Sequence, residues 1–175
     1  MDLFIFELLH SLSGKVSYID SMMIFLSKYG YILFILSVLS LFLFPAYRKM
    51  GLTGVVALVV GLLLNLLIGT LVDRPRPFIA HDIDILIPKE PSPSFPSDQA
   101  LIAGVFMTLF WILAPKLRIP VVILGLLAVV SRIYVGHHYP SDVVTGALLG
   151  VILVPVTRRI LSNRRGIRED KPLGL

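Results

Sequence analysis

The sequence predicts an all-α membrane protein: a polytopic bundle of about five transmembrane helices, preceded by an amphipathic helix at the membrane interface. Two observations support this fold class. Hydrophobic residues make up 56% of the 175 residues and charged residues only 15%, whereas about 25% are charged in an ordinary soluble domain. The apolar residues also fall in long runs separated by short polar segments. Because one soluble domain of this length could not bury so much apolar surface, lipid is the expected solvent.

Polar or helix-breaking residues bound each expected helix. Residues 1–18 are apolar but contain Glu7 and His10, so they are expected to form a helix that lies in the interface and does not cross the membrane. Five longer apolar runs are the expected spans, at residues 22–44, 51–72, 97–114, 119–134 and 140–156. The second run carries no charge and is long enough to cross a hydrocarbon core of about 30 Å.

The remaining segments are polar. Residues 73–96 combine charges with several prolines, a composition expected in a loop outside the hydrocarbon. Residues 157–175 form a basic tail. We find no internal repeat, so residues 1–175 are expected to form a single membrane-embedded domain. The N-terminus lacks a basic region and a small-residue cleavage site, so no removable signal peptide is expected.

Lysine and arginine residues predict the orientation in the membrane. They follow the first, third and fifth spans, at Arg48, Lys49, Lys116, Arg118 and in the tail. The positive-inside rule makes these ends, and the C-terminus, cytoplasmic. The 73–96 loop and the turn at His137 and His138 are then extracytoplasmic. Since topology explains most of the basic residues, the net charge of +5 does not indicate a nucleic-acid partner.

Three polar segments on the extracytoplasmic face hold the candidate chemistry: residues 73–78, 94–99 and 131–142. Arg76 and Arg132 can each bind a phosphoryl group bidentately, and an ionisable residue at the membrane depth of Arg132 indicates function. Pro96 is expected to begin a helix with Ser97 and Asp98 in its first turn, where free N–H groups favour an anion. The sequence therefore predicts a phosphate-binding site.

A nucleophile for phosphoryl transfer stands in the third segment. His138 and Asp142 are four residues apart, so Asp142 in the first turn of the last span can reach the imidazole. A carboxylate on one ring nitrogen would fix the tautomer and leave the other nitrogen to attack phosphorus. The chain has no cysteine, which excludes a thiolate nucleophile or metal site. The histidine mechanism needs no metal, and no metal or other cofactor is expected.

These segments resemble the motifs of the type 2 phosphatidic acid phosphatase superfamily. Its third motif is matched by Ser131-Arg132, five residues, His138, three residues and Asp142. Its second motif, Pro-Ser-Gly-His, resembles residues 96–99, and the end of its first, Lys-x6-Arg-Pro, resembles Arg76-Pro77. The opening of the chain and the strings RPRPF and GHHYPSD further resemble the bacitracin-resistance branch, the undecaprenyl-diphosphate phosphatases.

The resemblance implies a role for each matching residue. It implies that His138 is the nucleophile and Asp142 its orienting partner, and that Arg76, Ser97 and Arg132 bind the phosphate. The family's first-motif lysine is replaced by Gly69, and Arg74 is expected to supply its charge as a further phosphate ligand. Asp98, beside Ser97, is included in the predicted phosphate-binding segment.

Gln99 is the other departure from the motifs, because the family has its general acid at this position. Glutamine cannot donate a proton to a leaving oxygen, and general acid catalysis contributes about 10²–10⁴-fold. The resemblance therefore predicts substrate binding with slow or absent turnover. The sequence leaves open whether Gln99 is natural or an inactivating substitution.

Simpler interpretations of individual residues remain open. Asp98 and Asp142 could only stabilise helix N-termini. Arg74 and Arg76 could be anchors that extend to lipid headgroups. His137 is interpreted as a neighbour of the nucleophile, because the motif spacing selects His138.

Two classes of function fit the sequence. The first is an enzyme of the bacterial inner membrane that removes the terminal phosphate of undecaprenyl diphosphate at the extracytoplasmic face. Phosphatases for phosphatidylglycerophosphate, phosphatidic acid or lipid A 1-phosphate would share its site. The second is a protein that binds or transports a polyprenyl or phospholipid phosphate without cleaving it. A transporter is expected to contain repeats and broken helices at mid-membrane, and neither pattern is present. Oligomeric state is left open.

Overall fold

The computed structural model describes residues 1–81 and 83–163, and these form helices joined by loops and turns, with no strand among them. The α-helices are α1 (Asp2–His10), α2 (Ser17–Ser40), α3 (Arg48–Val72), α4 (Pro77–Ala80), α5 (Asp98–Leu113), α6 (Arg118–Tyr134) and α7 (Pro140–Asn163). Short 3₁₀ turns lie at Leu41–Leu43, Pro45–Tyr47 and Pro115–Leu117. The predicted all-α fold class is confirmed.

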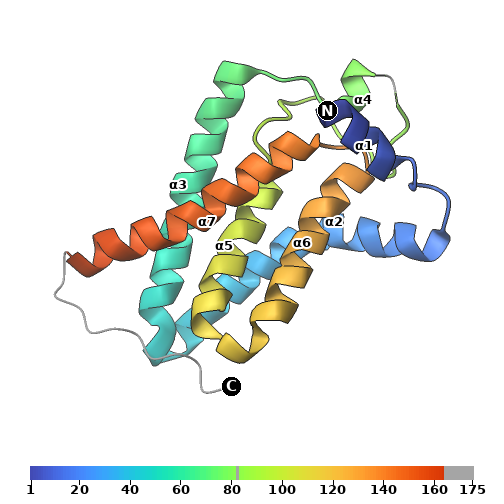
Figure 1. Cartoon of the computed structure of the whole chain (residues 1–175). Helices are drawn as coiled ribbons and strands as arrows, with labels where there is room; N and C mark the ends of the chain where they lie inside the picture. The colour runs from blue at the N-terminus through green and yellow to red at the C-terminus, as the bar shows by residue number, and fades with distance from the viewer. Residues whose placement is uncertain (82, 164–175) are drawn as a thin grey trace.

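Helix α5 is the centre of the bundle and packs against α2, α3, α6 and α7 (Figure 1). Ala100, Leu101, Val105 and Leu109 are fully buried in it. At 16 residues it is only about 24 Å long, shorter than a hydrocarbon core. The other helices that form spans, at Ser17–Leu43, Pro45–Ala80, Pro115–Tyr134 and Pro140–Asn163, are long and apolar enough to cross a membrane. These helices surround α5.

Glycines bring the backbones of α5 and α7 into direct contact. A Cβ atom on Gly146 would lie 2.3 Å from the carbonyl oxygen of Ser97, and one on Gly150 would lie 2.2 Å from that of Leu101. No side chain fits at these distances. Small residues of this kind allow close helix approach inside a membrane, and here they hold the start of α5 against α7.

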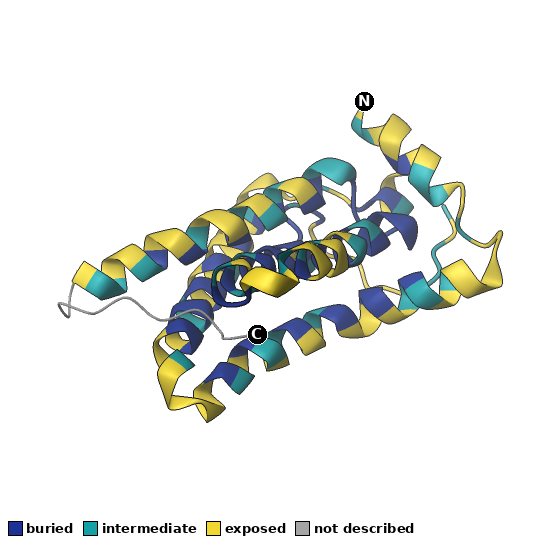
Figure 2. Cartoon of the chain, turned by 60° about the horizontal axis from the view of Figure 1, so that its bottom comes forward, coloured by how far each residue is buried: buried dark blue, intermediate teal, exposed yellow. Residues whose placement is uncertain are grey.

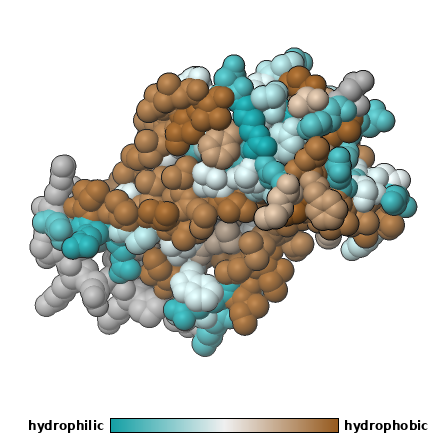
Figure 3. Space-filling model, turned by 45° about the horizontal axis from the view of Figure 1, so that its top comes forward, coloured by the Kyte–Doolittle hydropathy of each residue, from teal (hydrophilic) through white to brown (hydrophobic). Residues whose placement is uncertain are grey.

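The outward faces of the helices are apolar. Exposed residues form stripes along these faces (Figure 2), and many are large and hydrophobic, including Leu63, Leu66, Leu71, Ile119 and Ile152. In the space-filling view, apolar side chains cover the middle of the visible face and hydrophilic ones gather toward its margins (Figure 3). This surface suits contact with lipid.

Several predicted boundaries were wrong. Helix α2 begins at Ser17, not residue 22, so the segment before it is α1 and a turn. Helix α5 begins at Asp98 with Ser97 as its N-cap, so Pro96 is not the first helical residue. The short helix α4 was not predicted; Pro77 at its first position is compatible with helical φ. Helix α7 continues to Asn163 and includes part of the predicted tail, whose last residues, 164–175, lie outside the described chain.

Candidate active site

The three predicted polar segments meet at one end of the bundle, together with α1 and α4 (top of Figure 1). Polar side chains that are almost fully buried gather there: Arg76, Ser94, Ser97, Arg132, His137, His138 and Asp142. Buried polar groups in an apolar bundle are costly unless they are paired or bind a ligand. The end of the bundle is therefore the candidate site.

His138 has a defined tautomer. Its Nδ1 lies 2.8 Å from the carbonyl oxygen of Ser94, and its Nε2 lies 3.0 Å from Nη1 of Arg76. A carbonyl oxygen only accepts and a guanidinium only donates, so the proton is on Nδ1 and the lone pair is on Nε2. Burial lowers the pKa of His138 below its ordinary value, which keeps the ring neutral at pH 7. A neutral Nε2 is the form that can act as a nucleophile.

Asp142 does not hold the imidazole by a hydrogen bond, contrary to prediction. Its Oδ2 lies 3.7 Å from Nδ1 of His138, too far for a hydrogen bond. The carboxylate instead accepts from the Ser94 hydroxyl at 2.5 Å and the Tyr139 N–H at 2.8 Å, and it pairs with Arg74 at 2.7 Å. The Ser94 carbonyl therefore orients the ring, and Asp142 acts on it through its nearby charge.

Arg76 is held by backbone carbonyls. Its Nε donates to Ser92 at 3.1 Å, its Nη2 to Pro93 at 3.0 Å and its Nη1 to His137 at 3.0 Å. The guanidinium of arginine stays charged in proteins. The loop thus fixes one cation next to Nε2 of His138.

Arg132 is held by α2 and by the other histidine. Its Nη1 donates to the backbone oxygen and hydroxyl of Ser27, and its Nη2 lies 2.8 Å from Nδ1 of His137. The Nε2 of His137 lies 2.8 Å from the carbonyl oxygen of Ile87, so Nδ1 is the acceptor. Burial, with Arg132 nearby, lowers the pKa of His137 to about 3. The two adjacent histidines therefore have opposite tautomers, and each faces one arginine.

Three buried side-chain atoms lack partners among the described residues: Asn65 Oδ1, Ser97 Oγ and Arg132 Nε. Leaving a buried polar group unpaired costs about 1–3 kcal/mol. Ser97 Oγ and Arg132 Nε are donors, and both belong to residues predicted to bind phosphate. A phosphoryl group offers the acceptor oxygens that would satisfy them.

Three predicted site residues either bind other side chains or lie outside the buried cluster. Arg74 pairs with Asp2 at 2.6 Å and with Asp142, so its contact with phosphate stays a prediction. Asp98 is exposed and accepts a hydrogen bond from Asn65 at 3.0 Å. Gln99 is half-buried in the first turn of α5. The roles of all three remain predictions.

Ser27, Ser94 and Lys89 were not identified from the sequence. Lys89 lies two residues after Ile87, which binds His137, and three before Ser92, which binds Arg76. Lys89 is an exposed residue, and partial desolvation together with the charges of Arg76 and Arg132 lowers its pKa. No local pattern in the sequence indicates a role for these three residues. The adjacent histidines His137 and His138, in contrast, were a signal that both rings could belong to the site.

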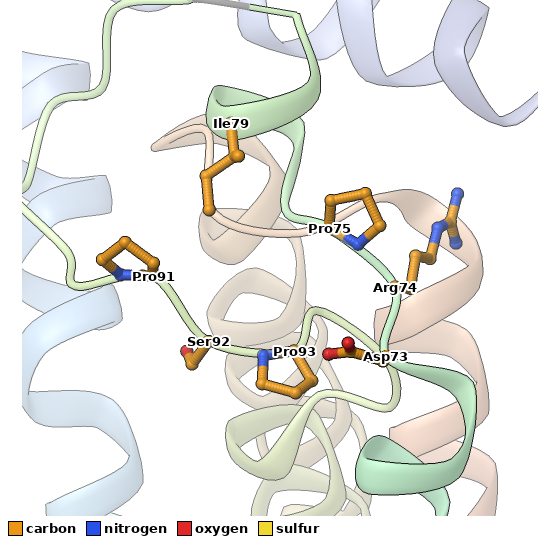
Figure 4. A pocket seen from close by; sticks show the side chains of 7 residues that line it. All are labelled: Asp73, Arg74, Pro75, Ile79, Pro91, Ser92 and Pro93. Atoms are coloured by element: carbon orange, nitrogen blue, oxygen red, sulfur yellow. The ribbon is translucent and has the colours of Figure 1, made fainter.

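An open pocket of about 410 Å³ lies beside the buried cluster (Figure 4). It is lined by Asp73, Arg74, Pro75, Ile79, Pro91, Ser92 and Pro93. The carbonyls that hold Arg76 come from this lining, at Ser92 and Pro93. Within the described chain, no cluster of three or more His, Asp or Glu side chains could hold a metal ion, and metal independence stays a prediction.

At one end of a membrane helix bundle, each of two buried arginines faces a neutral histidine, an arrangement that suits a phosphate group and fits the class of membrane lipid phosphatases. The family model of the PAP2 superfamily matches residues 49–166. The chain belongs to the PAP2 superfamily, as the motifs predicted.

Individual relatives agree with this assignment. The chain is 38% identical to the undecaprenyl-diphosphatase BcrC of Bacillus subtilis (strain 168) over 151 residues, 85% of this chain and 78% of the relative. The structure of Aquifex aeolicus LpxE matches with a TM-score of 0.77 and 25% identity, covering 90% of this chain and 94% of that one. A PAP2 type phosphatidylglycerolphosphate phosphatase from Bacillus subtilis matches with a TM-score of 0.73 at 20% identity, over 95% and 87% of the two chains. The last match shows likeness of fold alone.

Proposed function

We propose that this chain removes the terminal phosphate of undecaprenyl diphosphate to give undecaprenyl phosphate. One observation carries the proposal: the unprotonated Nε2 of His138 lies 3.0 Å from Arg76, in a cluster that also holds two unpaired buried donors, Ser97 Oγ and Arg132 Nε. This arrangement suits a phosphoryl group that is attacked by a histidine. The choice of lipid is supported by the relative named an undecaprenyl-diphosphatase, of which this chain covers 78%.

The reaction proceeds in two steps. The lone pair of His138 Nε2 forms a bond to the terminal phosphorus, and the bond from phosphorus to the bridging oxygen breaks. Undecaprenyl phosphate leaves with that electron pair. Water then attacks the phosphorus of the phosphohistidine and the P–N bond breaks. The lone pair returns to Nε2, and inorganic phosphate departs as dihydrogen phosphate, which carries both protons of the water. Arg76 and Arg132 stabilise the equatorial oxygens, and the charge of Asp142 stabilises the cationic ring of the intermediate.

The proposed location is the bacterial inner membrane, with the site on the extracytoplasmic face and the C-terminus in the cytoplasm. The cations at the start of α3, between α5 and α6, and near the end of α7 support this orientation. The site would then act on substrate in the outer leaflet.

Gln99 is expected to affect substrates unequally. A diphosphate departs as a lipid monophosphate, which is a stable anion. A phosphate monoester departs as an alkoxide, which needs a proton far more. A chain with Gln99 at the general-acid position should therefore be slow, and slower still on monoesters than on the diphosphate.

Comparison of the protein that carries Gln99 with its Gln99→His variant tests the proposal. Release of phosphate from undecaprenyl diphosphate and from phosphatidic acid is measured at one pH in one detergent. We expect the histidine variant to raise both rates, by up to about 10²–10⁴-fold for the monoester and by less for the diphosphate. Arg76 and Arg132 are retained in both proteins, so the KM values should stay similar.

Each other outcome contradicts a particular part of the proposal. If neither protein cleaves the diphosphate but one cleaves phosphatidylglycerophosphate, phosphatidic acid or lipid A 1-phosphate, the proposed substrate is wrong. If binding occurs without any hydrolysis, the chain is a binding protein. If the variant raises neither rate, residue 99 is not at the general-acid position; equal increases would refute the leaving-group argument.

A further inference from the structure

Asp2 connects the N-terminal helix α1 to the site. Its Oδ1 accepts from the backbone N–H of Ser141 at 2.9 Å, and its Oδ2 accepts from the Ser141 hydroxyl at 2.6 Å. Its Oδ2 also pairs with Nη2 of Arg74 at 2.6 Å. Burial alone would raise the pKa of Asp2, but the hydrogen bonds from Ser141 and Arg74 outweigh it and hold the pKa below its usual range. The side chain is therefore a carboxylate at neutral pH.

Arg74 carries the connection from Asp2 to Asp142. Its Nη1 donates to Asp142 Oδ1 and to the Ser141 hydroxyl, both at 2.7 Å. Its guanidinium also lies over the ring of Tyr139, 3.9 Å from the centroid. One cation is thus held in a single geometry between two carboxylates, of which Asp142 is fully buried and Asp2 is on the solvent side.

Helix α1 has other anchors that do not depend on Asp2. Phe6 is buried and packs near Tyr139, with ring centroids 5.8 Å apart. The ring nitrogens of His10 lie 2.9 Å from the carbonyl oxygen of Tyr134 and 3.0 Å from that of Asp84. An isosteric change at Asp2 would therefore remove its charge without releasing the helix.

We infer that Asp2 is a positioning residue for the reaction, which acts through Arg74 on Asp142 and His138. With Asp2 in place, Arg74 pairs with two carboxylates, so its positive charge offsets only part of the negative charge of Asp142. The remaining negative charge of Asp142 acts on His138. Without Asp2, Arg74 is balanced by Asp142 alone. The carboxylate then stabilises the cationic ring of the phosphohistidine less. This inference rests on the proposed function.

The pattern of kinetic change follows from these contacts. Asp2 touches none of Arg76, Ser97 and Arg132, so its loss should leave KM within about twofold while kcat falls about tenfold, the effect of one charge-assisted hydrogen bond. His138 contacts Arg76 and is also exposed to the charges of Arg132 and Asp142, and removal of the Asp2 charge makes these surroundings more positive. The acid limb of kcat/KM should therefore move to lower pH.

Four variants form the test: Asp2→Asn, Asp2→Glu, Arg74→Met and the double variant Asp2→Asn/Arg74→Met. Glu7→Gln removes an exposed carboxylate from the same helix and is the control, expected to behave as wild type. Asp2→Glu retains the charge and should keep the acid limb in place. If Asp2 acts through Arg74, Asp2→Asn should lower kcat no further in the Arg74→Met protein. Thermal melting confirms that each variant is folded.

A second measurement needs no substrate. The ring nitrogens of His138 are titrated by ¹⁵N NMR in detergent micelles and assigned with His138→Gln. We expect Asp2→Asn, but not Glu7→Gln, to lower the pKa of His138. Three results would overturn the inference. His138 could titrate in Asp2→Asn as it does in the unmodified protein, the losses of kcat in Asp2→Asn and Arg74→Met could add in the double variant, or Asp2→Asn could raise KM and leave kcat unchanged. If the chain proves inactive on the diphosphate, the titration still decides whether Asp2 and His138 are coupled.

Discussion

The neutral state of His138 depends on its two partners. The Ser94 carbonyl oxygen accepts a hydrogen bond from Nδ1–H at 2.8 Å, and the Arg76 guanidinium donates to Nε2 at 3.0 Å, so Nε2 carries no proton. Burial adds to both effects, because it disfavours a charged ring. Nε2 of His138 is thus unprotonated, and its lone pair accepts a hydrogen bond from Arg76. Asp142 contributes a charge at 3.7 Å without a hydrogen bond to the ring.

This arrangement predicts the pH dependence of the reaction. The reactive form of His138 is neutral, and its pKa is lowered by burial. Activity should therefore persist as the pH falls below about 6.5, the ordinary histidine value, and be lost only as the pH passes through the lowered pKa. The acid limb of kcat/KM reports this group in the free enzyme. A midpoint at or above 6.5 in a profile from pH 4 to 8 would contradict the assignment.

At the level of helices, the close contact of α5 and α7 positions the site. The N–H of Ser97, at the start of α5, donates to the carbonyl oxygen of Asp142 in α7 at 3.1 Å. Gly146, one turn along α7 from Asp142, lies beneath Ser97. The unpaired hydroxyl of Ser97 is therefore placed by a backbone contact that only glycine permits.

A methyl group at residue 146 should separate the two helices. Its Cβ would lie 2.3 Å from the Ser97 carbonyl oxygen, so Gly146→Ala must move Ser97. We expect activity to fall about 100-fold, the scale reported for displacements of about 1 Å, and thermal stability to fall as well. Gly30→Ala is the control, since its Cβ would be 3.6 Å from Ala128 Cβ, an ordinary contact. Equal activities in the two variants would show that Ser97 does not depend on this packing.

For the whole molecule, the bundle separates an apolar body from a polar end. Helices that are long and apolar enough to span a membrane surround the shorter α5. Loop 73–96, helix α1 and the turn between α6 and α7 gather at the end where α5 begins (Figure 1). A polar site at this end can meet the headgroup of a lipid while the bundle stays in contact with its tail.

The proposed orientation can be tested with single cysteines, because the chain has none of its own. Glu90→Cys lies in the loop expected outside, and Lys116→Cys lies in a turn expected in the cytoplasm; both positions are exposed. A membrane-impermeant maleimide applied to intact spheroplasts should label position 90, and position 116 only after lysis. The reverse pattern would place the site on the cytoplasmic face.

Much of the fold and of the candidate site could be predicted from the sequence. Apolar runs that exceed the width of a bilayer predict helices, because an unpaired backbone is not stable in lipid. The spacing of Arg132, His138 and Asp142 indicated the site, since these residues share one short segment. Boundaries were less accurate at Ser17 and Asp98, because tertiary contacts and caps set where a helix begins.

The hydrogen bonds between distant segments of the candidate site could not be predicted from the sequence. His138 depends on Ser94, 44 residues away; Arg132 depends on Ser27, 105 residues away; and Arg74 depends on Asp2, 72 residues away. Each pair forms only after the helices have packed. A hydrogen bond requires atoms within about 3 Å in a suitable direction, and local periodicity carries no information about distances between separate helices.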